Sequence, residues 1–123
     1  MIQTESRVIV ADNTGAKTAL VIGILKGTGA RKATVGDKVK VAIKSASSSG
    51  QVKNAEVHTA IVVRTRKEIK RRDGSYIRFA DNAIALIDKN TGSPLGKKIF
   101  GPVALEVKSK WYKDIANLAD EII

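Results

Sequence analysis

The stretch Arg64-Thr-Arg-Lys-Glu-Ile-Lys-Arg-Arg-Asp-Gly-Ser-Tyr-Ile-Arg78 combines dense positive charge with the pattern of a β-hairpin. Seven of the chain's 22 lysines and arginines lie in these fifteen residues, against only Glu68 and Asp73. The stretch therefore carries +5, half of the formal +10 of the whole chain. Apolar residues on both sides predict β-strands, and Asp73-Gly74 is a turn sequence. A basic hairpin on a small β domain indicates an anionic partner, above all nucleic acid.

The isoleucines of this stretch determine how its two strands pair. A three-residue loop, Arg72-Asp73-Gly74, with Gly74 in the left-handed conformation, separates an apolar inner face from a charged outer face. A two-residue loop would set Ile69 opposite Arg78 and mix the faces. In the three-residue arrangement, Arg71 pairs with Ser75, and the inner face holds Ile61, Val63, Thr65, Ile69 and Ile77, with Phe79 opposite Lys67. The outer face holds Arg64, Arg66, Glu68, Lys70, Tyr76 and Arg78, with Glu68 across from Arg78.

Lys67 on the inner face predicts that the apolar core ends there and that the hairpin tip projects from the domain. Charged hairpin tips are often only solvated, but the positive charge of the whole chain favours a bound polyanion. A projecting cationic hairpin fits between RNA helices. With about five to seven phosphate contacts, log affinity should fall against log salt concentration with a slope of roughly −4 to −6.

Valine and isoleucine dominate the apolar residues, and turn sequences such as Asp-Asn, Gly-Asp and Asn-Thr-Gly separate short apolar segments. This pattern is typical of an all-β barrel or sandwich. In the clearest segment Val39, Val41 and Ile43 alternate with lysines and one alanine. The expected strands are Arg7 to Ala11, Thr18 to Leu25, Lys38 to Ser45, Val57 to Ile69, Tyr76 to Phe79 and Ala83 to Asp88. No repeat or boundary interrupts them, so we expect a single domain over residues 1–123.

The apolar spacing changes from two residues to three or four after Gly101. Pro102 suits the first position of a helix. The apolar residues that recur at helical spacing are Val103, Val107, Trp111, Ile115, Leu118 and Ile122. We therefore expect one or two short helices over about residues 102–119, with this stripe packed against the barrel as core.

Composition limits the chemistry of this chain. It has no cysteine, which excludes disulfides and thiolate metal sites, and a metal site would depend on the single histidine, His58, and on carboxylates. We expect no metal and no cofactor. The N-terminal residues lack an apolar secretion signal, and no apolar run approaches the ~18 residues of a membrane helix. The sequence therefore predicts a cytoplasmic protein with no membrane partner.

Enzymatic activity has little support in the sequence. Gly15-Ala16-Lys17-Thr18 lacks the glycine that precedes the lysine of a phosphate-binding loop, and a strand-like segment follows it. Gly27-Thr-Gly-Ala-Arg-Lys32 lacks the third glycine of a dinucleotide-binding loop. A catalytic dyad would have to recruit His58, which lies on an expected strand, and the twelve carboxylates form no evident acid–base pair. We therefore expect no enzyme.

Seven segments, in order, carry a further pattern. They are Met1-Ile-Gln3, Ala11-Asp-Asn-Thr-Gly-Ala-Lys17, Val35-Gly-Asp37, Ala60-Ile-Val-Val-Arg-Thr-Arg-Lys67, Asp73-Gly-Ser-Tyr-Ile-Arg-Phe79, Asn82-Ala83 and Ile99-Phe-Gly-Pro-Val103. In sequence and spacing they resemble the universal large-subunit ribosomal protein L-fourteen family. The resemblance covers essentially the whole chain, and several of its segments are long and individually specific.

The resemblance implies a five-stranded β-barrel with small C-terminal helices, bound to large-subunit rRNA at the interface between the ribosomal subunits. It also implies intersubunit bridges to small-subunit rRNA. Among proteins, it implies contacts with ribosomal proteins L-three and L-nineteen and, in bacteria, with a silencing factor that blocks subunit joining. For that factor it implies a docking surface at Gly96-Lys97-Lys98 and near Lys113.

The sequence departs from the family pattern in places. Arg72 stands where the hairpin loop usually has a proline, which adds a charge at the tip. Lys97 and Lys98 replace a more usual threonine and arginine, and a lysine lacks the planar fork of an arginine. Leu105 and Val107 stand where arginines are frequent.

We therefore expect a noncatalytic ribosomal protein that stabilises folded RNA by neutralising phosphates. The residues expected to contact RNA are Arg64, Arg66, Lys67, Lys70, Arg71, Arg72, Arg78, Tyr76, Arg31, Lys32, Lys44, Lys53 and Lys17. The alternative is a free barrel-type nucleic-acid-binding module, for which 4% aromatic content leaves little stacking surface beyond Tyr76. An enzyme acting on polyanions is a third, weaker class.

Overall fold

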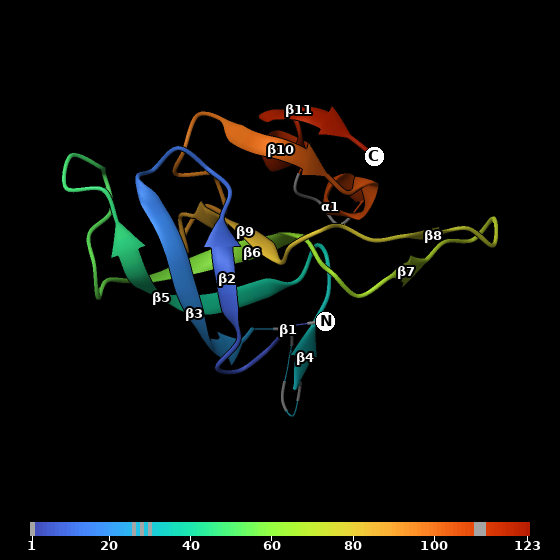
Figure 1. Cartoon of the computed structure of the whole chain (residues 1–123), viewed down its shortest axis with the longest axis horizontal. Coiled ribbons are helices and arrows are strands. Elements are labelled where there is room, and N and C mark those ends of the chain that lie inside the picture. Colours follow the sequence, from blue (N-terminus) through green and yellow to red (C-terminus); the bar gives the residue numbers. More distant parts are fainter. Residues whose placement is uncertain (1, 26, 28, 30, 110–112) are drawn as a thin grey trace.

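The computed structural model is organised around a closed β-barrel (Figure 1). The structure describes residues 2–25, 27, 29, 31–109 and 113–123. In spatial order, the five strands of the barrel are β2 (Arg7–Val10), β3 (Ala16–Ile24), β5 (Lys38–Ala46), β6 (Val57–Arg64) and β9 (Ala83–Ile87). Neighbouring strands are antiparallel except for β2 and β9, which are parallel. The mainly β fold class is confirmed, and of the two architectures that the pattern allowed, the barrel is correct.

The interior of the barrel follows from the alternation of side chains along its strands. On β5, Val39, Val41 and Ile43 are at most 1% exposed, while Lys40 and Lys44 face solvent. Successive side chains of a strand point to opposite faces, so one face of β5 packs the core and the other carries positive charge. Burial of each valine or isoleucine contributes roughly 1.5–3 kcal/mol. Their alternation with lysine therefore fixes which face of β5 turns inward.

Strand β9 and the second half of β6 are buried on both faces. All five residues of β9 and residues 60–64 of β6 are buried. Their outer side is covered by the C-terminal segment (Figure 1), where the Ala104 amide donates to the Val63 carbonyl over 3.3 Å. The Leu95 amide likewise donates to the Leu86 carbonyl over 3.1 Å. This double cover explains why the apolar residues of β9 form a continuous run instead of alternating.

The C-terminal segment contains a two-stranded parallel sheet, with short helices between its strands in the described residues. Its elements are β10 (Ile99–Val103), α1 (Leu105–Ser109), α2 (Lys113–Ala116) and β11 (Ala119–Ile122), with β10 paired to β11. The expected one or two short helices are confirmed, but they occupy a smaller part of the chain than residues 102–119. Pro102 begins no helix but lies in β10 opposite Glu121, a position that proline tolerates because β10 is an edge strand. Among the described residues, no helix is long or apolar enough to span a membrane.

The apolar stripe of this segment packs against the core, although only part of it is helical. Val103 of β10, Val107 of α1 and Ile115 of α2 are buried. Leu118 and Ile122 are half-buried and pack against the same core. Trp111 lies outside the described residues. The spacing thus predicted burial correctly, and secondary structure only in part.

Two further pairs of short strands lie outside the barrel. They are β1 (Ile2–Gln3) with β4 (Lys32–Ala33), and β7 (Ile69–Lys70) with β8 (Tyr76–Ile77). The second pair lies in residues 66–79, hereafter the arm, which projects from the barrel at the end opposite the β5–β6 loop (Figure 1). The sequence did not indicate β1, β4, β10 or β11, because runs of two to five residues carry little periodicity.

Candidate nucleic-acid interface

The arm has the pairing that its isoleucines predict. The paired residues are Ile69 with Ile77 and Lys70 with Tyr76. At the tip, the Arg71 amide donates to the Ser75 carbonyl over 2.9 Å, and the Gly74 amide donates to the Arg71 carbonyl over 3.0 Å. Gly74 has a φ of 88°, the left-handed conformation that closes a three-residue hairpin loop. The three-residue loop is confirmed.

The two carboxylates of the arm, on Glu68 and Asp73, interact with residues next to them in the sequence. The Asp73 carboxylate accepts hydrogen bonds from the Ser75 hydroxyl over 2.6 Å and the Ser75 amide over 2.9 Å, and these bonds lower the pKa of Asp73 below its ordinary 3.8. The pKa of Glu68 is lowered below 4.5 by a backbone hydrogen bond and then by Lys67, whose ammonium lies 3.5 Å away. Both groups are therefore ionised at neutral pH. The exposed cations of the arm, which is described throughout, are Arg66, Lys67, Lys70, Arg72 and Arg78.

The root of the arm departs from the expected register. Strand β6 ends at Arg64, and the Phe79 amide donates to the Thr65 carbonyl over 2.9 Å, so the expected pairing of Phe79 with Lys67 is wrong. The chain leaves the ladder after Thr65 because the Asn82 side chain accepts the Arg66 amide over 2.9 Å. Lys67 is exposed, but Ile69 and Phe79 of the arm still pack against the core, so the expectation that the apolar core ends at Lys67 is wrong.

Arg64 does not lie on the exposed outer face. Its residue is 8% exposed, and its Nη1 donates to the carbonyls of Phe100 over 2.9 Å and Pro102 over 3.4 Å. Its Nε lies 3.0 Å from Oδ1 of Asp81. The expected outer-face position of Arg64 is therefore wrong: the C-terminal segment covers this end of β6, and the guanidinium binds the backbone of β10. Gly101 has a φ of 84°, and a Cβ there would overlap Nη1 of Arg64.

Arg71 ties the arm to the C-terminal segment. Its Nε and Nη2 donate to the two carboxylate oxygens of Glu106 over 3.2 and 3.0 Å, and Nη2 also donates to the Ile123 carbonyl over 2.6 Å. The hydrogen bonds to Glu106 raise the pKa of Arg71. This bidentate contact was not foreseen, since 35 residues separate the partners and neither belongs to a recognisable motif. Arg71 is half-buried and occupied within the protein.

The other predicted cations are exposed but lie on separate parts of the surface. Lys17 is on β3 and Lys44 on β5. Lys53 is in the β5–β6 loop, at the end of the molecule opposite the arm (Figure 1). Arg31 and Lys32 lie at β4, outside the barrel. The residues predicted to contact RNA therefore form one cluster on the arm and several separate surface positions, not one continuous face.

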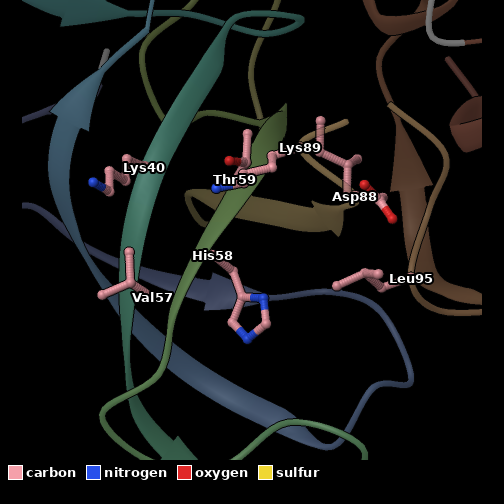
Figure 2. A pocket seen from close by; sticks show the side chains of 8 residues that line it. Lys40, Val57, His58, Thr59, Asp88, Lys89 and Leu95 are labelled. Atoms are coloured by element: carbon pink, nitrogen blue, oxygen red, sulfur yellow. The ribbon is translucent and has the colours of Figure 1, made fainter. Parts of the chain in front are cut away.

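A hollow of about 450 Å³ surrounds His58 (Figure 2). Figure 2 shows the imidazole between Val57 and Leu95. Nε2 of His58 lies 3.6 Å from a carboxylate oxygen of Glu56. Among the described residues, no three His, Cys, Asp or Glu side chains are grouped to hold a metal ion. The hollow therefore presents no assembled set of metal ligands.

Comparison with known proteins identifies the family of this barrel. The model of the ribosomal protein L14p/L23e family matches residues 1–123. The chain belongs to this family. It is similar to large ribosomal subunit protein uL14 of Petrotoga mobilis (strain DSM 10674 / SJ95), with 52% identity over 122 residues and 99% of each chain covered. The resemblance noted from the sequence motifs is thereby confirmed.

In this L14p/L23e chain, the lysines assigned to a protein partner are exposed. Lys97 and Lys98 precede β10, where both of their amides donate to the Asn13 side chain, over 2.8 and 3.3 Å. The Lys98 ammonium lies 5.5 Å from the ring centre of Phe100, which is 52% exposed. Lys113 begins α2. Phe100 was missed as a surface residue because the sequence did not indicate the alternation of β10, in which Ile99 faces inward.

Proposed function

We propose that this structural constituent of the large ribosomal subunit binds large-subunit rRNA through its arm and contributes to intersubunit bridges with small-subunit rRNA. The observation that carries the proposal is the arm itself, which extends exposed cations beyond the barrel (Figure 1). A narrow projection of this kind can enter a groove or a gap between RNA helices, where phosphates approach it from more than one side.

Neutralisation of phosphates is the mechanism that the arm supports. Arg64 and Arg71 are occupied by Asp81, Glu106 and backbone carbonyls, so they serve the protein and not the RNA. The RNA-facing set of the arm is then Arg66, Lys67, Lys70, Arg72 and Arg78, with Tyr76 among them. Five phosphate contacts would give a salt slope of roughly −4.5 on the duplex scale.

The outlying cations support a role in holding separate RNA segments. Lys53 lies in the β5–β6 loop, at the end opposite the arm (Figure 1), while Lys17 and Lys44 lie on barrel strands and Arg31 and Lys32 lie at β4, outside the barrel. Positive charge at both ends lets one rigid barrel fix the distance between two RNA segments. This arrangement suits assembly and bridging better than it suits a free module that tracks a single strand.

Protein partners fit a different surface. We assign Lys97, Lys98 and Lys113 to protein contacts, either with ribosomal proteins L-three and L-nineteen or with a silencing factor. The exposed Phe100 ring beside Lys98 supports this assignment, because aromatic side chains are enriched in protein interfaces. The proposed location is the cytoplasmic ribosome, and the proposed role is noncatalytic.

Sedimentation of ribosomal subunits in high salt tests the proposal. We expect the protein, at its native expression level, to run with the large subunit. Recovery only in the free protein fraction would overturn the ribosomal role and favour a free nucleic-acid-binding module.

A second experiment tests the surface. Replacing Arg66, Lys70 and Arg78 together with glutamine should reduce the salt slope of rRNA binding by about 2 to 3 units. The matched control replaces Lys40, Lys89 and Lys108, three exposed lysines outside the proposed surface, and removes the same charge. Equal losses of slope in both variants would mean that net charge, and not the arm, determines binding.

A further inference from the structure

We propose that a hollow on the outer face of the arm holds one unpaired nucleobase of the RNA, with guanine preferred. This inference rests on the proposed RNA-binding function and adds a base-specific contact to it. The hollow has a volume of about 410 Å³ and is lined by Glu68, Tyr76, Ile77 and Arg78. It lies on the element that projects furthest from the barrel, where an RNA segment can reach it.

Tyr76 supplies the stacking surface. It is 62% exposed, the largest value among the large apolar and aromatic side chains of the described residues. It pairs with Lys70 and, unlike Ile69 and Phe79 of the arm, is not among the side chains that pack against the core, so packing within the protein does not explain its size. An exposed aromatic ring on a basic surface stacks well on a base, and a tyrosine loses little conformational entropy when it does so.

Glu68 supplies the means to discriminate between bases. An ionised carboxylate only accepts hydrogen bonds, and here it stands in a surface that otherwise attracts phosphate. Guanine offers two adjacent donors on its Watson–Crick edge, the ring N1–H and the exocyclic amine, which match the two carboxylate oxygens. Uracil offers only one donor between two carbonyl oxygens that a carboxylate repels. The hollow therefore favours a base edge rich in donors.

Arg78 connects the base site to the RNA backbone. It lines this hollow and also a second one, which it shares with Arg66, Phe79 and Ala80. A phosphate next to an extruded base would lie between the two arginines while the base lies against Tyr76. The two hollows together therefore accommodate one nucleotide, its base in the first and its phosphate near the second.

The test uses the full-length protein and three short RNA duplexes that differ at one position. One has a single bulged guanine, one has a bulged uracil, and one has no bulge. We expect the wild-type protein to bind the guanine bulge roughly 5- to 150-fold more tightly than the unbulged duplex, the range expected for one stacked base. The uracil bulge should fall between them. Tyr76→Ala should remove the preference for bulged RNA, and Tyr76→Phe should keep it, because both rings stack.

Two further variants make the result decisive. Glu68→Ala should abolish the preference for guanine over uracil and leave tighter binding of bulged RNA intact; a retained guanine preference would exclude Glu68 as the discriminating residue. Arg72→Gln, at an exposed residue that lines neither hollow, should weaken binding to all three RNAs by the same factor. Equal affinity of the wild-type protein for all three RNAs would overturn the base site and leave phosphate binding standing. Absence of salt-dependent binding to any of them would overturn the proposed function as well.

Discussion

The barrel and the arm differ in how far they expose their arginine side chains. Arg64 and Arg66 are two residues apart on what the sequence predicts to be one face, yet Arg64 is buried and Arg66 is exposed. The difference lies in what covers each residue: the backbone of β10 accepts hydrogen bonds from Arg64, whereas Arg66, beyond the end of β6, is exposed. In this stretch, Arg64 and Arg71 are therefore structural because the C-terminal segment binds them, whereas Arg66 and Arg72 are exposed.

Asp12 is a second buried charged residue whose side chain, like that of Arg64, forms several hydrogen bonds. Asp12 is 5% exposed, and its Oδ2 accepts the Leu86 amide over 2.8 Å. Its Oδ1 accepts the Thr14 hydroxyl over 2.7 Å and the Thr14 amide over 3.3 Å. Burial of a charge is tolerated when hydrogen bonds replace the lost water. In the arm, by contrast, the side chains of Lys70, Arg72 and Arg78 are exposed to solvent.

The largest expected effect separates the two arginines directly. Arg64→Met should lower the free energy of unfolding by about 3–5 kcal/mol, because Asp81 and two β10 carbonyls lose their partner. Arg66→Met should change it by less than about 1 kcal/mol. Urea unfolding measures both. RNA affinity at low temperature should show the reverse order, with Arg66→Met the weaker binder, and a similar stability loss in both variants would contradict the comparison.

The next effect compares two glycines with nearly the same φ. Gly101→Ala should cost about 2–3 kcal/mol of unfolding free energy, because a Cβ at φ 84° is strained and also displaces the Arg64 guanidinium. Gly74→Ala at φ 88° meets no atom within 4 Å and should cost only about 1 kcal/mol. Denaturant unfolding of the two variants isolates the contribution of the clash. Equal losses would show that the guanidinium moves aside without cost.

Much of the barrel could be predicted from the sequence because its strands are long and alternate. The expected strand at Lys38 to Ser45 agrees with β5, and the three-residue loop of the arm follows from the spacing of Ile69 and Ile77. These features depend on neighbours in sequence. The C-terminal sheet does not depend on sequence neighbours, because the paired residues of β10 and β11 are 19 or 20 positions apart. Pro102, which lies in a short edge strand, also suits the first position of a helix.

The sequence predicted the candidate site as a charged stretch. It did not predict which of its cations are exposed and which are bound within the protein. Charge and spacing placed Arg66, Lys70 and Arg78 correctly on an exposed hairpin. They could not show that Arg64 and Arg71 are occupied, because their partners lie 17 to 52 residues away in sequence. Ion pairs and backbone carbonyls at such distances are set by the tertiary fold. A count of cations in this stretch therefore overstates how many of them are exposed.

A smaller effect concerns the junction between the two regions. A double-mutant cycle with Arg71→Gln and Glu106→Gln should give a coupling energy of about 1 kcal/mol, since the side chains are 25% and 24% exposed and water screens the pair only partly. Hydrogen exchange provides the second measurement: the Arg71 amide, which donates to the Ser75 carbonyl, should exchange faster in either single variant. Coupling near zero with unchanged exchange would mean that the arm holds its orientation without this contact.

The smallest effect lies at the tip and depends on pH. The hydrogen bonds from Ser75 lower the pKa of Asp73 in the folded arm, so their contribution is present above the ordinary pKa of 3.8 and is lost as the pH falls through the lower folded value. An NMR titration should therefore find Asp73 ionising below pH 3.8, and Ser75→Ala, which removes the hydroxyl bond, should move the midpoint upward. Thr91→Ala, a hydroxyl deletion in another exposed turn, should leave it unchanged. Because the Asp73 carboxylate is fully exposed, global stability should hardly respond, which distinguishes a locally ordered tip from the buried polar network of the barrel.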